Sequence, residues 1–361
     1  MSDFFSNIYR NFSAWLTSNK ENINPAYVYV TNQGSNSVSQ YIVSSHGRLA
    51  PLATATVATG TTPVFIAVAP SGKSVYVANQ GGNSISQYKI SANGYLVPIS
   101  SPVSAGTSPV DIAIDPSGRY AYVANSSSND VSQYVIDGNG MLNAMFPSTI
   151  ETGIIPVAIT VDPSGKYVYV VNNGSNDVSQ YKITENGSLT KMSPATIVAG
   201  TAPRAIAVHP SGRYVYVVNR TSGDISQFVI NPDGSLSQSS TPVAAGKHTI
   251  FISIATSGKH AYVANQNSDS ISQYNLAENG RLLPMTPATV ATALTPVCIA
   301  VTASGEYAYA TNIRSNDVSQ YEIGEYGELR AIPVNAWGDA SVSAEVSPRC
   351  VKTVKMKIQE A

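Results

Sequence analysis

Six basic residues stand at repeated positions in the second half of the chain, where their charge could hold an anion. Four of them precede or begin short β-branched runs, namely Arg204, Lys247, His248 and Arg349. The other two, Arg220 and Arg314, lie one and two residues after an Asn that ends an aromatic segment. The matching positions earlier in the chain hold Val64, Val110 and Val157, with Asp111 as the one acid nearby. Cations gathered on one side of a site attract a negatively charged ligand.

These residues belong to a repeated unit, which is clearest in residues 203–228, PRAIAVHPSGRYVYVVNRTSGDISQF. Its β-branched and aromatic runs predict strands over 206–208, 214–217 and 225–228. His-Pro-Ser-Gly after the first run is typical of a type I turn. Asp233-Gly234 is a hairpin signal that leads into a fourth strand near Leu236. One unit therefore predicts a four-stranded antiparallel meander.

The unit occurs seven times, with a spacing of 46 or 47 residues. The Asn that ends the second strand recurs at Asn32, Asn79, Asn125, Asn172, Asn219, Asn265 and Asn312. The Gln of the third strand recurs at Gln40, Gln87, Gln133, Gln180, Gln227, Gln273 and Gln320. A period of about 40–50 residues with four strands per unit is typical of a β-propeller blade. The sequence thus predicts an all-β, seven-bladed propeller over residues 26–361.

The two ends of the repeat region predict how the ring closes. The first copy begins at Tyr27 and has no first strand before it, whereas Pro348-Arg349-Cys350-Val351 near the C-terminus matches Pro296-Val297-Cys298-Ile299. We expect the C-terminal segment to supply the missing first strand of blade one, which would remove a free sheet edge. The entries to the first strands and the loops after the second strands should then share the face around the channel mouth.

Residues 1–25 precede the repeats and have a different pattern. The apolar residues Phe5, Ile8, Tyr9, Phe12, Trp15 and Leu16 share one helical face, which predicts a short amphipathic helix followed by a polar linker. We expect this helix to pack on the propeller, with a partner or membrane contact as the alternative. The segment lacks the pattern of a secretory signal, and the chain has no apolar run of membrane-spanning length.

The amino-acid composition limits which kinds of partner the chain is expected to bind. Hydrophobic residues make up 43%, enough for a core, while only 12% are charged and the net charge is −1. This balance gives no case for a nucleic-acid partner. A neutral surface rich in Ser, Asn, Gly and Thr mildly favours an extracytoplasmic setting of a soluble protein, while the compartment and the oligomeric state stay open.

Other chemical patterns are missing or have a structural explanation. The sequence contains no Gly-rich phosphate loop, no metal-spaced His/Cys cluster and no nucleophile elbow, so we expect neither a cofactor nor a metal. Asp130, Asp177, Asp224 and Asp317 recur before third strands, where turn formation explains them better than cation binding. The Ser-Gln-aromatic triplet recurs in all copies and therefore belongs to the scaffold.

Residues 27–32, Tyr-Val-Tyr-Val-Thr-Asn, resemble the signature of the YVTN repeat, and the whole unit resembles blades of lactonase-type seven-bladed propellers. In that family Pro-Arg-His, then His-Pro-x-Gly, then Asn-Glu contribute an Arg, a His and a Glu to the active site. Here Pro203-Arg204, His209-Pro210 and Asn219 match, but Ala205 and Arg220 replace the His and the Glu. The resemblance therefore implies a cationic site whose general base is missing from its usual position.

Two functions follow from these observations. The first is a non-catalytic or weakly catalytic propeller that presents its basic channel mouth to an anionic small molecule or protein surface. The alternative, implied by the resemblance, is a lactone hydrolase similar to 6-phosphogluconolactonases, in which Arg204 is the cation and His248 or Asp111 the base. The replacement of two family residues favours the first hypothesis.

Overall fold

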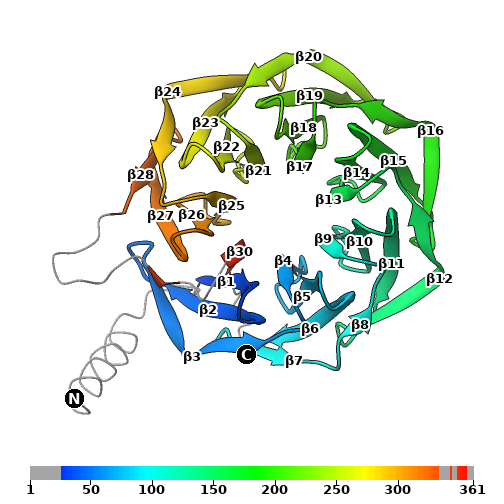
Figure 1. Ribbon diagram of the computed structural model, residues 1–361, viewed down its shortest axis with the longest axis horizontal. Coiled ribbons are helices and arrows are strands. Elements are labelled where there is room, and N and C mark those ends of the chain that lie inside the picture. Colours follow the sequence, from blue (N-terminus) through cyan, green and yellow to red (C-terminus); the bar gives the residue numbers. More distant parts are fainter. Residues whose placement is uncertain (1–25, 333–341, 344–347, 356–361) are drawn as a thin grey trace.

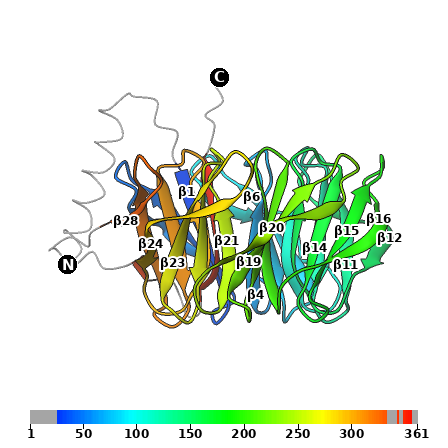
Figure 2. The same ribbon diagram turned by 90° about the horizontal axis from the view of Figure 1, so that it is seen from above.

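The computed structural model describes residues 26–332, 342–343 and 348–355, and the side chains of residues 26–332. Seven antiparallel sheets form a ring around a central channel, which Figure 1 shows along the ring axis and Figure 2 from the side. The seven-bladed all-β propeller predicted from the repeat is therefore confirmed. The predicted helix and linker at residues 1–25 lie outside the described residues. The described part of the chain contains no helix that is both long and apolar enough to cross a membrane.

The first strands are innermost and line the channel. They are β4 (Pro63–Val68), β9 (Pro109–Ile114), β13 (Pro156–Val161), β17 (Pro203–Val208), β21 (Thr249–Ile254), β25 (Pro296–Val301) and β30 (Pro348–Lys355). The second strands come next, and their side chains are almost entirely buried. They are β1 (Ala26–Asn32), β5 (Ser74–Asn79), β10 (Tyr120–Asn125), β14 (Tyr167–Asn172), β18 (Tyr214–Asn219), β22 (His260–Asn265) and β26 (Tyr307–Asn312).

The third strands follow outward in each blade. They are β2 (Ser37–Val43), β6 (Ser84–Ile90), β11 (Asp130–Ile136), β15 (Asp177–Ile183), β19 (Asp224–Ile230), β23 (Ser270–Leu276) and β27 (Asp317–Ile323). The outer strands of five blades are continuous: β3 (Leu49–Ala58), β12 (Leu142–Glu151), β16 (Leu189–Val198), β20 (Leu236–Ala244) and β24 (Leu282–Ala291).

The outer strands of blades two and seven are each divided into two pieces. The pieces are β7 (Leu96–Pro98) with β8 (Val103–Ser104), and β28 (Leu329–Ala331) with β29 (Val342–Ser343). Opposite the third-strand Gln, the pairing register of the continuous outer strands also slips, as it does between Ser132 and Tyr134. In blade two the strand is interrupted at this place, between Pro98 and Val103, a difference from the uniform four-stranded unit that the repeat predicts, whereas in blade seven residues 333–341 between the two pieces lie outside the described residues.

Blade one is closed by the two ends of the repeat region. Its strand order is β3-β2-β1-β30, and β30 pairs antiparallel with β1 from Ala26 opposite Lys355 to Asn32 opposite Pro348. The C-terminal segment therefore supplies the first strand of this blade, as the sequence predicts. With this pairing β1 has a partner on both sides.

The third-strand Gln joins each blade to the next. Its Oε1 accepts a hydrogen bond from the backbone N–H of the Leu that begins the following outer strand, as in Leu142 N to Gln87 Oε1 at 2.7 Å. The same bond closes the ring from Leu49 N to Gln320 Oε1 at 2.9 Å. In parallel, the second-strand Tyr donates to a glycine carbonyl of the next blade, for example Tyr122 Oη to Gly187 O at 2.6 Å. These bonds confirm that the Ser-Gln-aromatic triplet is part of the scaffold.

Candidate functional site

The residue before each of the first strands β4, β9, β13, β17, β21 and β25 has the same unusual backbone conformation. Its φ is positive at Thr62, Ser108, Ile155, Ala202, His248 and Thr295. Its carbonyl accepts a hydrogen bond from the residue after the second strand, as in Arg220 N to Ala202 O at 3.0 Å. This repeated turn places the entry to the first strand and the start of the loop after the second strand on one face of the ring, as expected from the sequence.

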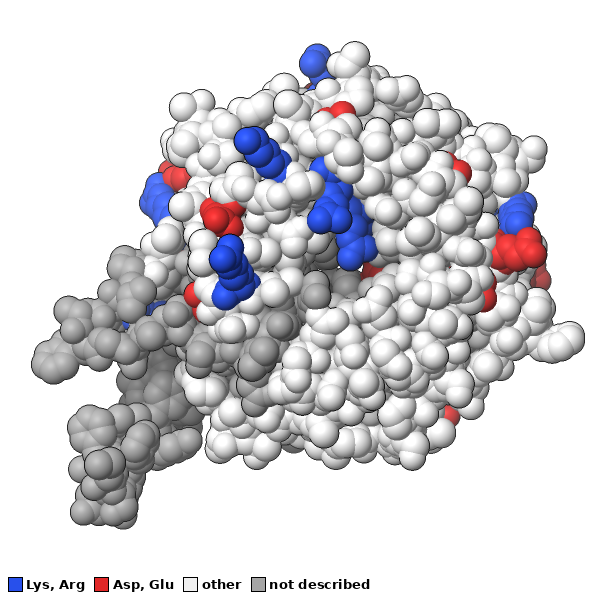
Figure 3. All heavy atoms as spheres, in the orientation of Figure 1, with Lys and Arg blue, Asp and Glu red and all other residues white. Residues whose placement is uncertain are grey.

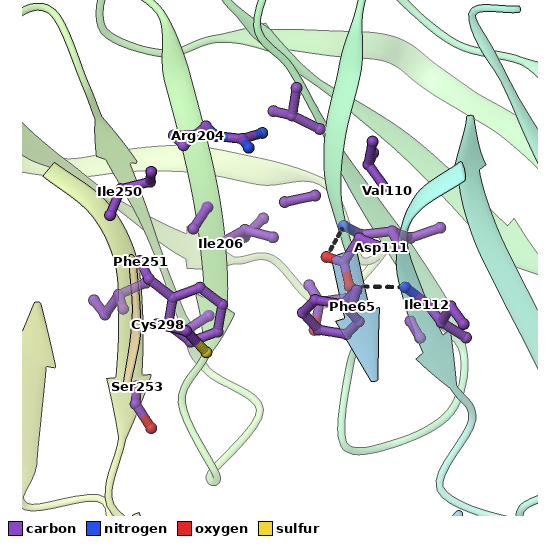
Figure 4. A pocket seen from close by; sticks show the side chains of 18 of the residues that line it. Phe65, Val110, Asp111, Ile112, Arg204, Ile206, Ile250, Phe251, Ser253 and Cys298 are labelled. Atoms are coloured by element: carbon purple, nitrogen blue, oxygen red, sulfur yellow. Dashed lines mark hydrogen bonds between the residues drawn. The ribbon is translucent and has the colours of Figure 1, made fainter. Parts of the chain in front are cut away.

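The central channel has a volume of about 740 Å³ and is lined by the first strands (Figure 4). Among the described residues that line it, Arg204 and Asp111 are the two charged ones. Arg204 lies near the start of β17, where the register against β18 slips between Pro203 and Ala205. In Figure 4 the Arg204 side chain extends into the channel, and Asp111 faces the same space from β9.

Asp111 is held in place by the backbone of two blades. The side chain is buried, and its Oδ1 accepts a hydrogen bond from Ile112 N at 2.7 Å. Its Oδ2 accepts another from Ile159 N of the next blade at 2.9 Å (Figure 4). These two bonds fix the orientation of the carboxylate while leaving it with further acceptor capacity, because each carboxylate oxygen can accept more than one hydrogen bond.

The predicted basic residues share one face of the ring but differ in their distance from the channel. Figure 3 shows Lys and Arg side chains gathered on one side of the central opening, over the blades that contain β17, β21 and β25. The entry turns place Arg220, Lys247 and Arg314 on this face, since Asn267 N donates to Lys247 O and Arg314 N donates to Leu294 O, each at 3.2 Å. Arg204 lines the channel, whereas these three do not. The side chain of Arg349 lies outside the described residues.

His248 lies beside the channel mouth and is not among the residues that line the channel. Its Nδ1 is buried and has no hydrogen-bond partner in the described residues, and the same holds for Oε1 of Gln266, whose N–H donates to His248 O at 3.0 Å. Such buried unpaired atoms are uncommon. Of the three predicted catalytic residues, Arg204 and Asp111 therefore line the channel, whereas His248 does not.

His209 and the aspartates before the third strands have structural contacts. His209 lies at the opposite end of the blade, where Nδ1 lies 2.8 Å from Ser211 Oγ and Nε2 lies 2.8 Å from Gly258 O of the next blade. The aspartates before the third strands accept hydrogen bonds from the second-strand Asn, as in Asn125 Nδ2 to Asp130 Oδ1 at 2.6 Å. Both sets therefore take part in turns and blade contacts.

Sequence reasoning missed the polar side chains of Gln80, Thr160 and Ser253 in the channel and the backbone donors of its wall. Gln80 lines the channel and follows Asn79 just as Arg220 follows Asn219, so its repeat position was the signal that could have revealed it. The N–H groups of Ile112 and Ile159 carry no such signal, because side-chain types do not show which backbone groups face the axis.

Comparisons with known proteins agree with this architecture. The family model "Lactonase, 7-bladed beta-propeller" matches residues 21–153 and 156–346. No curated protein matches the sequence of the chain. Similar solved structures include a protein of Bacteroides fragilis proposed to be a 6-phosphogluconolactonase, with 20% identity, a TM-score of 0.79 and coverage of 92% of this chain and 98% of that chain.

A second similar structure is the periplasmic gluconolactonase of Pseudomonas aeruginosa, with 18% identity, a TM-score of 0.74 and coverage of 91% and 99% of the two chains. A third, from Lactobacillus plantarum, has 16% identity, a TM-score of 0.78 and coverage of 91% and 99%. At these identities the likeness shows a shared fold.

Proposed function

Because the chain belongs to the seven-bladed β-propeller lactonase family, we propose that it hydrolyses a lactone with an anionic group at the mouth of its central channel. The observation that supports this proposal is the pair of charged residues in the channel, the cation Arg204 and the carboxylate Asp111. Family membership alone would not be enough, because one fold hosts many functions.

The reaction needs a base for water and a positive group for the developing oxyanion. In the proposed mechanism Asp111 accepts a proton from a water molecule, and the resulting hydroxide attacks the lactone carbonyl carbon. The ring C–O bond then breaks, and the leaving oxygen takes up a proton to give a hydroxy acid. Arg204 stabilises negative charge on the carbonyl oxygen or on an anionic substituent, and the two N–H groups at Asp111 hold the carboxylate in a fixed orientation in the channel wall.

A phosphorylated sugar lactone fits the charges of this face best. Arg204 in the channel and Arg220, Lys247 and Arg314 around it would attract a phosphate group, and the attraction should weaken with added salt. Two of the similar structures are described as a proposed 6-phosphogluconolactonase and a gluconolactonase. We therefore take 6-phosphogluconolactone as the first substrate to test and gluconolactone as its uncharged counterpart.

The test compares hydrolysis of both lactones, corrected for the spontaneous reaction, in the wild type and in single variants. Asp111→Asn should lower kcat by about 10²–10⁴-fold, the usual contribution of a general base. Arg204→Ala should weaken binding of the phosphorylated lactone by about tenfold or more, because it removes a charge-assisted hydrogen bond. Lys259→Ala, at the turn on the opposite face, is the matched control and should behave as wild type.

His248→Ala adds a further arm to this test. Since His248 does not line the channel, this variant should keep most of the activity. A loss as large as that of Asp111→Asn would assign the base to the imidazole and contradict the mechanism. Absence of any hydrolysis above the spontaneous rate in the wild type would contradict the proposed function itself.

Recognition without turnover is the second candidate, and it too has a supporting observation. The positions that hold a His and a Glu in the related enzymes are occupied by Ala205 and Arg220, and both oxygens of Asp111 already accept backbone hydrogen bonds. A basic mouth of this kind suits an anionic small molecule or protein surface. Calorimetric binding of 6-phosphogluconate, together with no turnover of either lactone, would favour this candidate.

A further inference from the structure

Asp111 shows how the channel wall can hold a carboxylate. Its two oxygens accept hydrogen bonds from the N–H groups of Ile112 in its own blade and Ile159 in the next one. Six first strands have an Ile at this level, and we call their N–H groups the inner N–H row: Ile66, Ile112, Ile159, Ile206, Ile252 and Ile299. Ile66 apart, these residues are among those that line the channel.

The pairing register shows that the other members of the row point the same way. Ile159 lies opposite Val170 in β14, and its N–H is directed away from β14, towards Asp111. Ile206 lies opposite Val217 and Ile252 opposite Val263, in the same register and after the same slip. In an antiparallel ladder, equivalent residues direct their N–H groups to the same side. The N–H groups of Ile206 and Ile252 therefore face away from their second strands, and no acceptor among the described residues bonds them.

The side chain of the residue before each Ile determines whether the protein itself covers or bonds the nearby N–H groups of the inner N–H row. In blade three it is Asp111, which occupies two N–H groups, and in blades two and six it is Phe65 and Phe251, whose rings stand in the channel wall (Figure 4). In blade five it is Ala205, whose methyl group cannot accept a hydrogen bond. The N–H groups of Ile206 and Ile252 thus have the arrangement that binds Asp111, without a side chain to fill it.

Two further features distinguish the N–H groups of Ile206 and Ile252 from the rest of the inner N–H row. Arg204 directly precedes Ala205 in β17, and Figure 4 shows its side chain extending into the channel. The Ile206 side chain is half-buried, whereas Ile112, Ile159 and Ile252 are buried, so the wall is more open here. Paired backbone N–H groups beside a cation form a favourable site for an anionic oxygen.

From these contacts we propose that the N–H groups of Ile206 and Ile252, together with Arg204, bind the carboxylate of a hydroxy-acid ligand. One ligand oxygen takes each N–H, as Oδ1 and Oδ2 of Asp111 do with Ile112 and Ile159. The inference rests on the proposed function for the ligand class, since lactone hydrolysis produces a hydroxy acid. In the preceding step the same donors would face the carbonyl oxygen of the lactone as it becomes negatively charged.

The direct test is a titration of the ¹⁵N-isoleucine-labelled protein with gluconate, followed by amide NMR signals. We expect the Ile206 and Ile252 amide protons to move downfield in a saturable manner, whereas Ile66 and Ile299 stay unchanged as internal references. Arg204→Ala should weaken this binding by about tenfold or more. Equal shifts along the whole row, or no shift of Ile206 and Ile252 at saturating gluconate, would overturn the proposal.

A second test copies the arrangement of blade three into blade five. Ala205→Asp places a carboxylate where Asp111 stands in blade three, so it should occupy the two N–H groups and weaken gluconate binding by about tenfold or more. Ala207→Asp, one pleat further along β17, places the same charge in the channel and is the matched control. An equal loss in both variants would indicate general charge repulsion and contradict the assigned site.

These tests separate the site from the proposed function. Gluconate binding at Ile206 and Ile252 without hydrolysis of either lactone would support the carboxylate site and remove the hydrolase proposal. Hydrolysis of a lactone by a protein whose Ile206 and Ile252 signals do not respond to gluconate would support the hydrolase proposal and contradict the carboxylate site. Because the NMR titration uses the wild-type chain, it decides the question even if Ala205→Asp fails to fold.

Discussion

At the scale of single residues, His248 stands where the sevenfold repetition is broken. The N–H of the residue that enters the first strand is bonded by an Asn or Asp side chain of the preceding blade in five described blades, for example Ile155 N to Asn129 Oδ1 at 2.7 Å. In front of His248 the corresponding residue is Gly223, which has no side chain to do this. His248 nevertheless has φ 53°, and its buried Nδ1 has no hydrogen-bond partner in the part of the chain that the structure describes. Blade six therefore lacks one contact to blade five that the other described entries to first strands have.

Restoring the side chain should therefore stabilise the protein. Gly223 has φ 68°, a conformation that Asn adopts at the equivalent positions 36, 83, 129 and 176, and a Cβ there would lie 3.4 Å from Gly246 O, an ordinary contact. Gly223→Asn should raise the free energy of unfolding by about 1 kcal/mol, through the new hydrogen bond to His248 N and a less flexible unfolded chain. Gly223→Ala, which adds a Cβ without an acceptor, is the control and should not stabilise. Urea unfolding measures both, and equal stability of the two variants would argue against the missing bond.

At the scale of elements, the third strands of blades two, three, four, six and seven are hydrogen-bonded to the blade before them as well as to the one after. The third-strand Tyr donates its hydroxyl to the outer strand of the preceding blade, as in Tyr181 Oη to Glu151 O at 2.6 Å and Tyr134 Oη to Ser104 O at 2.6 Å. In blade five Phe228 stands at this position and is buried without a hydroxyl. By the constant separation of 30 residues, the carbonyl left without this donor is that of Val198.

Phe228→Tyr should supply that bond. The ring keeps its position, and the new hydroxyl should donate to Val198 O, raising the free energy of unfolding by about 0.5–1.5 kcal/mol. Tyr181→Phe is the reciprocal control in blade four and should lower it by a similar or larger amount. If calorimetry shows that both changes destabilise the protein, the hydroxyl contact is not equivalent in the two blades.

The sequence predicted most elements because each copy repeats the same local signals. Turns such as His209-Pro210-Ser211-Gly212 and the buried Tyr-Val strands determine the meander, and Pro348 to Val351 revealed the closing strand. The broken outer strand of blade two was not predicted, since the break lies at the register slip opposite the third-strand Gln. The site was predicted in part: Arg204 and Asp111 line the channel, but the position of His248 and the inner N–H row depend on backbone geometry that residue types do not reveal.

At the scale of the whole molecule, the same two hydrogen bonds join every blade to the next, so that no blade is independent of its neighbours. The Gln and Tyr bonds run from every blade to the next, including Tyr309 Oη to Gly47 O at 2.8 Å across the closure. Between the blades lie fully buried tyrosine rings of the second and third strands, for example Tyr122 and Tyr181. Because each blade buries its faces only against its neighbours, we expect the ring to unfold as one cooperative unit.

High pH should reveal this shared core. Burial raises the pKa of the tyrosines in the middle of the second strands, such as Tyr122 and Tyr216, above 10, and that of the third-strand Tyr88, Tyr134, Tyr181 and Tyr274 to about 12. A raised folded-state pKa means that stability is fully present below the unfolded pKa of about 10 and falls as the pH rises towards the folded value. Each such tyrosine then lowers the free energy of unfolding by about 1.4 kcal/mol per pH unit, so about ten of them cancel a typical stability of 5–15 kcal/mol.

We expect one cooperative unfolding step between about pH 10 and 11, with tyrosinate absorbance and far-ultraviolet circular dichroism changing together and recovering on return to pH 8. Gradual ionisation of these tyrosines in a protein that keeps its native dichroism would contradict the proposed coupling between the buried rings and the closed ring of blades.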